Sequence, residues 1–213
     1  MCYLIEINDF LIQKAETMNI IAGFARGVEL AVPPGMPVRP TTGRVRKALF
    51  DSLGDLSQEH VLDLFSGSGA LALESLSRGA ASAAMVELSN QHIACIEYNL
   101  QSVRNTGVSA PATLINADAT RPESYLARLK TVPTLIFADP PYPASAECFS
   151  TIIHNDYFNK TLCGARIFWE IPDTPGAAGE FLKQHEALDD FNLRRFAGTM
   201  FLTGIIKSAN REK

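Results

Sequence analysis

Asp139 and Tyr142 belong to a tetrapeptide, Asp139-Pro140-Pro141-Tyr142, that directly follows the apolar run Leu135–Ala138. The run has the length and composition of a short buried strand, and two consecutive prolines prevent a helix and fix the turn. A carboxylate and nearby carbonyls accept hydrogen bonds from an exocyclic amine, and a tyrosine ring stacks on a planar base. The residues therefore suit methyl transfer to a base nitrogen. For an isolated match, a strand-ending turn with a solvated Asp and a packing Tyr is the simpler interpretation.

A glycine-containing turn earlier in the chain offers a second candidate site. A strand pattern at 60–65 leads into Ser66-Gly67-Ser68-Gly69 and then into an apolar helical pattern. Glycines permit a tight turn and a close backbone approach, and the N-terminus of the next helix favours a carboxylate or a polarised ligand. Glu87 ends the next strand pattern about 20 residues further on, where an acid can bind ribose hydroxyls. The turn is neither a full G-x-G-x-x-G nor a P-loop, so by itself it is a weak signal.

Alternating strand and helix patterns must position these residues. We expect an α/β fold with a doubly wound, mostly parallel sheet and helices on both faces. The seven expected strands lie at 60–65, 82–87, 112–116, 134–138, 164–170, 191–196 and 199–207, the last two forming an antiparallel hairpin. The expected helices lie at 69–78, 89–104, about 122–130, 145–154 and 180–186. Ligands bind at the carboxyl edge of such sheets, where the glycine turn, Glu87 and Asp139 would meet.

The N-terminal part has a different pattern. Residues 1–17 form a tail without a definite prediction, 18–55 a hairpin and helix extension, and 56–213 the main domain. Strands at 20–22 and 28–32 predict the hairpin, and a threonine pair at 41–42 offers the N-cap of the helix. Against a net charge of −4, this extension carries a local basic patch: Arg26, Arg39, Arg44, Arg46 and Lys47. Such a patch suits a phosphate backbone, although a solvated cationic face explains it equally well.

Composition limits the remaining possibilities. With 213 residues and 46% apolar residues, the chain is expected to be one globular domain with at most a small appendage. Its four cysteines and four histidines show no ligand spacing, so no metal is expected, and Cys95 is expected in the core. We expect no membrane span and no secretory signal, which favours the cytoplasm.

The order of glycine turn, ribose acid and Asp-Pro-Pro-Tyr resembles class I S-adenosylmethionine-dependent methyltransferases, whose fold is Rossmann-like. The stretches Ile20–Gly23, Arg39–Phe50 and Asp63–Leu71 closely resemble bacterial enzymes that methylate N2 of a guanine in 16S rRNA. The likeness runs from about residue 18 to residue 207. It departs at Lys47, where the family usually has an acid, and at Tyr142, where many members have Phe.

The resemblance implies S-adenosylmethionine as cofactor and 16S rRNA as partner, in an assembling small ribosomal subunit or as naked RNA, with the protein a monomer. The cofactor residues implied are Asp63, Phe65, Ser66, Gly67, Gly69, Glu87, Asp118, Thr41 and Thr42. The base would be held by Asp139, Pro140, Pro141 and Tyr142. The RNA backbone would meet Arg26, Arg39, Arg44, Arg46 and Lys47, with Arg39 alternatively facing the cofactor. Helix capping explains Asp118 and both threonines equally well, and Glu87 could be a solvated strand end.

Other classes share part of this pattern. A nicotinamide-dependent oxidoreductase would share the glycine turn and the acid, but it leaves Asp-Pro-Pro-Tyr unexplained. A non-catalytic RNA-binding module would share the basic patch without needing a cofactor pocket. Within methyltransferases, adenine N6 or a protein glutamine remains an alternative acceptor.

Overall fold

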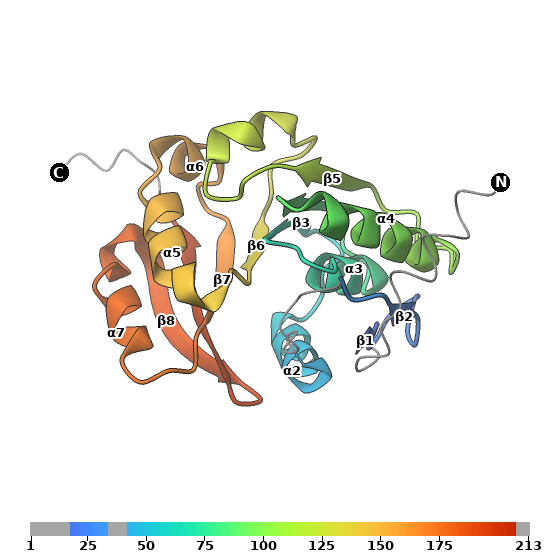
Figure 1. Ribbon diagram of the computed structural model, residues 1–213, viewed down its shortest axis with the longest axis horizontal. Coiled ribbons are helices and arrows are strands. Elements are labelled where there is room, and N and C mark those ends of the chain that lie inside the picture. Colours follow the sequence, from blue (N-terminus) through green and yellow to red (C-terminus); the bar gives the residue numbers. More distant parts are fainter. Residues whose placement is uncertain (1–17, 34–41, 208–213) are drawn as a thin grey trace.

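The computed structural model describes residues 18–33 and 42–207 (Figure 1). The predictions for residues 1–17, Arg39 and Thr41 lie outside these ranges. No helix within them is long and apolar enough to span a membrane.

A seven-stranded sheet forms the centre of the molecule, in the order β5-β4-β3-β6-β7-β9-β8. The parallel strands are β3 (His60–Leu64), β4 (Ser82–Glu87), β5 (Ala112–Asn116), β6 (Leu135–Ala138) and β7 (Arg166–Ile171). The hairpin of β8 (Leu188–Phe196) and β9 (Thr199–Ile206) closes one side, with β9 antiparallel to β7. The predicted fold class is confirmed. The chain order reverses between β3 and β6, and this switch point is where open α/β sheets bind ligands.

Helices cover both faces of the sheet (Figure 1). One face packs against α2 (Gly43–Leu53), α3 (Ala70–Ser77) and α4 (Asn90–Arg104). The other packs against α5 (Ser145–Ile153), α6 (Asp156–Thr161) and α7 (Ala177–Leu182), followed by the single turn η4 (His185–Ala187). Strand residues alternate between the two cores, with Val61 on the first and Leu62 on the second. Cys95 lies in the core as expected, and burial raises the pKa of its thiol to about 11.

Two segments outside the main sheet differ from the sequence-based expectations. The helix expected over about 122–130 is two 3-10 turns, η1 (Pro122–Ser124) and η2 (Leu126–Arg128). Tyr125 separates them with a φ of −132°, outside the helical range, while its ring is fully buried. The sequence analysis also missed α6, a helix of only 6 residues whose N-cap Asn155 accepts from the Phe158 amide at 2.9 Å.

The N-terminal hairpin is antiparallel and is built from β1 (Met18–Asn19) and β2 (Glu29–Leu30). The first strand lies before the expected range 20–22, and the second is shorter than the expected 28–32. It is attached to α3 through Glu74, a fully buried acid that accepts from the amides of Ile21 at 2.7 Å and Ala22 at 3.1 Å. Only glycine fits at position 23, because a Cβ there would lie 1.8 Å from the Ser77 carbonyl oxygen. These contacts hold the extension against the helix that follows the glycine turn.

Candidate active site

The glycine turn after β3 has an unusual backbone. Phe65, Gly67 and Gly69 all have positive φ, at 58°, 56° and 77°. A positive φ in an aromatic residue costs on the order of 1–3 kcal/mol and persists where surrounding contacts enforce it. Here the Phe65 ring packs edge-on against Trp169, and the Ser66 hydroxyl donates to the Asp63 carbonyl at 2.7 Å. The amides of Ser66 and Gly67 donate to the Val86 carbonyl at 3.1 Å and to the Glu87 carboxylate at 2.9 Å, which fixes the turn against the end of β4.

Asp63 lies beneath this turn with an exposed fraction of 2%. Its carboxylate accepts from the Ala72 amide at 3.2 Å, one of the unpaired donors at the N-terminus of α3. Burial raises the pKa of Asp63 well above its ordinary range. The Ala72 hydrogen bond opposes this rise, whereas the charges of Asp139 and Glu87 add to it.

Glu87 connects the turn to the end of β4. One carboxylate oxygen accepts from the Gly67 amide at 2.9 Å, and the other accepts from the Ser89 amide at 2.9 Å. His92 Nδ1 lies 3.4 Å from the Glu87 carboxylate. With 9% exposure, Glu87 is not the solvated strand end that was the alternative, and its ribose-binding role remains a prediction.

Asp139 reaches the same edge through the strand register. Leu64 of β3 pairs with Ala138 of β6, so Phe65 and Asp139 follow at the same level on neighbouring strands. Asp139 is half-buried, Pro140 is buried and Pro141 is exposed. Pro141 leads into η3 (Tyr142–Ala144).

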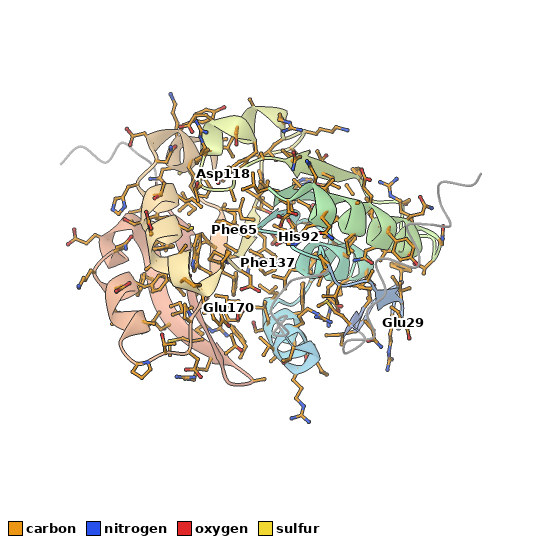
Figure 2. The ribbon with its side chains drawn as sticks, viewed as in Figure 1. Glu29, Phe65, His92, Asp118, Phe137 and Glu170 are labelled. Carbon is orange, nitrogen blue, oxygen red and sulfur yellow. The ribbon has the colours of Figure 1, made fainter. Side chains whose placement is uncertain are left out.

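Tyr142 is half-buried and its hydroxyl donates to the Glu170 carboxylate at 2.7 Å. Figure 2 shows Phe65, Phe137 and Glu170 near the middle of the molecule, between the two sets of helices. Glu170 was not among the predicted site residues, although an acid within the apolar run Ile167–Ile171 was a signal in the sequence.

A pocket of about 50 Å³ lies at this edge, between the glycine turn after β3 and Asp139 after β6. It brings together four of the predicted cofactor residues and Asp139 with others that the sequence analysis did not place there. The lining consists of Met18, Arg46, Asp63, Phe65, Ser66, Gly67, Ser68, Ala70, Leu71 and Asp139.

Arg46 requires a correction. It was predicted to contact RNA phosphates, but it is 2% exposed and lines the pocket. Its guanidinium donates to the Asn19 carbonyl at 2.8 Å, and burial lowers its pKa, opposed by the charge of Glu74. The sequence carried a signal, since Arg46 lies one helical turn before the buried Phe50.

The other predicted cations are on the surface or outside the described ranges. Arg26, Arg44 and Lys47 are exposed, and Lys47 forms an ion pair with Asp51 one turn along α2. Arg39 lies outside the described residues. A role of the exposed cations in RNA binding stays a prediction.

Asp118 and Thr42 have local partners outside the pocket. One oxygen of Asp118 accepts from the amide and hydroxyl of Thr120, at 2.9 and 2.7 Å, in the turn after β5. Thr42 caps α2 by accepting from the Val45 amide at 3.4 Å. The capping interpretation is confirmed for Thr42, whereas Asp118 stabilises the turn and does not cap η1, whose N-cap is Arg121. Any contact of either residue with a cofactor stays a prediction.

The fold and the edge site define a class I methyltransferase fold. Solved structures agree with this class. A hypothetical protein of Thermus thermophilus has a TM-score of 0.65 and 26% identity, over 89% of this chain and 99% of that one. A ribosomal protein L11 methylase of Lactobacillus delbrueckii shares the fold, with a TM-score of 0.59 and 18% identity over 82% of this chain and 83% of that one.

The family model described as Conserved hypothetical protein 95 matches residues 18–181, and the chain belongs to this family. Among curated relatives, Ribosomal RNA small subunit methyltransferase D of Escherichia coli K12 is 38% identical over 126 residues. That alignment covers 59% of this chain and 60% of the relative. The family resemblance drawn from the sequence is confirmed.

Proposed function

We propose that this protein transfers a methyl group from S-adenosylmethionine to the exocyclic N2 of a guanine in 16S rRNA. One observation carries the proposal. Asp63, on the side proposed to bind the methyl donor, and Asp139, on the side proposed to bind the acceptor base, line a single pocket at the switch point. The curated relatives named as small-subunit rRNA methyltransferases support the substrate class. The residue-level roles rest on the arrangement described above.

The donor side fits S-adenosylmethionine. The positive end of the α3 dipole favours a polar or negatively charged ligand group beside the turn, and Glu87 offers a carboxylate to ribose hydroxyls. Arg46, a buried cation in the pocket, is matched to the carboxylate of the methionine part. When bound, this group supplies a methyl made electrophilic by its sulfonium.

The acceptor side must orient a weak nucleophile. The lone pair of a guanine amine is delocalised into the ring, so the amine needs hydrogen bonds that favour its tetrahedral form. Asp139 and the Pro140 carbonyl would accept from its two N–H groups, and Asp139 would take the proton that is released. Positioning of this kind supplies several kcal/mol of the barrier reduction.

A paired guanine is inaccessible, so the base must be unpaired or flipped out and stacked on Tyr142. Arg26, Arg44 and Lys47 would contact the RNA backbone around it. We expect the reaction to take place in the cytoplasm, on rRNA or an assembling small subunit, with the protein as a monomer.

The test is methyl transfer from labelled S-adenosylmethionine to rRNA from a strain that lacks the corresponding gene, with digestion to nucleosides. N2-methylguanosine as the labelled product supports the proposal, and Asp139→Ala serves as the matched inactive control. Labelled N6-methyladenosine as the product would show that adenine N6, and not guanine N2, is the acceptor. No incorporation, together with calorimetric binding of NAD rather than S-adenosylhomocysteine, would overturn the proposal.

A further inference from the structure

Glu170 is a buried acid beside the acceptor side that the proposed reaction does not use. It lies in β7 with an exposed fraction of 3%. Its carboxylate accepts from the Tyr142 hydroxyl at 2.7 Å, and its carbonyl accepts from the Ser145 hydroxyl at 3.4 Å. A buried carboxylate is costly unless hydrogen bonds compensate it, so its presence in an apolar strand calls for a reason.

The strand register places Glu170 next to the reacting edge. Ala138 of β6 pairs with Trp169 of β7, so Asp139 and Glu170 follow at the same level on neighbouring strands. Trp169 is fully buried, packs against Phe65 and donates its indole N–H to Ser145 at 3.0 Å. The Glu170 backbone is therefore fixed by the core, and its carboxylate is a rigid acceptor for Tyr142.

The bond between Tyr142 and Glu170 does not anchor a core element. The η3 turn that carries Tyr142 contains no buried residue, and the prolines on both sides of Tyr142 are exposed. The hydroxyl bond restricts the direction of this half-exposed ring. A ring held in one direction is a preorganised stacking surface, and small misplacements at such a surface reduce rate strongly.

We propose that Glu170 is a positioning residue that holds the Tyr142 ring in the orientation on which the target base stacks. This inference rests on the proposed function, because it assigns the ring to the acceptor base.

The experiment compares Tyr142→Phe, Glu170→Gln, Glu170→Ala and the double variant Tyr142→Phe/Glu170→Ala in methyl transfer to rRNA. Tyr142→Phe keeps the ring and removes the bond, and Tyr157→Phe, a partly exposed tyrosine in α6, is the matched control. We expect Tyr142→Phe and Glu170→Ala each to lower kcat/KM for RNA by about tenfold. We expect Glu170→Gln, which can still accept, to retain most of the activity.

Two readouts separate positioning from a general structural role. The affinity of Tyr142→Phe for S-adenosylhomocysteine should match the wild type, and the double variant should lose no more activity than either single variant. Wild-type kcat/KM in Tyr142→Phe, or additive losses in the double variant, would overturn the inference while the proposed function stands. A wild-type protein that transfers no methyl group to RNA would overturn both.

Discussion

The proposed donor side and acceptor side of the carboxyl edge are built differently. On the donor side, Asp63 and Glu87 are 2% and 9% exposed, and both already accept hydrogen bonds from backbone amides of the turn and its helix. On the acceptor side, Asp139 and Tyr142 are half-buried. The turn η3, which begins at Tyr142, contains no buried residue. On the donor side, the residues proposed to bind the cofactor also form the hydrogen bonds that fix the turn. On the acceptor side, the residues proposed to bind the base are partly exposed at the end of a buried strand.

This difference separates two kinds of mutational effect. Glu87 holds the amides of Gly67 and Ser89 and would bind the cofactor, so its removal should lower stability and affinity together. An acceptor-side residue would contact the base, so its removal should mainly lower turnover. The following variants test that division.

Asp139→Ala should give the largest effect. We expect kcat to fall by at least about 100-fold, the lower range for a general acid or base, because both orientation and proton acceptance are lost. The affinity for S-adenosylhomocysteine and the Tm should stay near those of the wild type. Asp139→Asn, which keeps an acceptor oxygen, should lie between the two. A loss smaller than about tenfold, roughly 1.4 kcal/mol, would contradict the assigned role.

Glu87→Ala should show the donor-side signature. The loss of a charged hydrogen-bond acceptor should weaken binding of S-adenosylhomocysteine by about 1.5–3 kcal/mol in calorimetry. The Tm should also fall, because the amides of Gly67 and Ser89 lose their acceptor. Glu97→Ala, an exposed acid on α4, is the control and should change neither. Unchanged affinity in Glu87→Ala would remove the ribose assignment.

Arg44 and Arg46 both lie on α2 but should have different roles, Arg44 in binding RNA and Arg46 in binding the cofactor. Removing the exposed cations in Arg26→Ala/Arg44→Ala should reduce the log–log salt slope of RNA binding by about two units, one per released phosphate contact. Arg46→Met should leave that slope unchanged and weaken S-adenosylhomocysteine binding. The control Arg104→Ala/Lys130→Ala removes two exposed cations from elsewhere. Equal slopes in the first variant and the wild type would make the patch a solvated face.

Asp63→Asn should give the smallest and most pH-dependent effect. Because burial raises the folded-state pKa of Asp63, the stability it contributes is present below its unfolded pKa of about 3.9 and is lost as pH rises. The Tm advantage of Asp63→Asn over wild type should therefore grow from about pH 4 toward neutrality.

Asp55→Asn is the comparison variant, because the pKa of Asp55 is shifted in the opposite direction from that of Asp63. Hydrogen bonds from Ser57 lower the pKa of Asp55, so its contribution is present above its unfolded pKa and is lost as pH falls. The Tm of Asp55→Asn should lie below the wild type near neutrality and converge with it on acidification. A pH-independent Tm difference for Asp63→Asn would show that its charge is not penalised by burial.

Much of the fold could be predicted from local patterns. Strand alternation, the glycine turn and the Asp-Pro-Pro-Tyr turn depend on residues close in sequence, and β4 and β5 have the predicted bounds. The expected helix at about 122–130 failed because burial of Tyr125 overrides a weak local helix pattern.

The sequence by itself determined the α/β order and the chemical groups that come to the carboxyl edge, because periodicity and turn chemistry act over a few residues. Only the tertiary structure decided how those groups meet. The register of Leu64 with Ala138 and of Ala138 with Trp169 brings Asp139 beside the turn and Glu170 beside Tyr142. Packing likewise turned Arg46 inward while Arg44 stayed exposed. Register and helix rotation minimise the exposure of apolar surface over the whole core, which no short segment of the chain encodes.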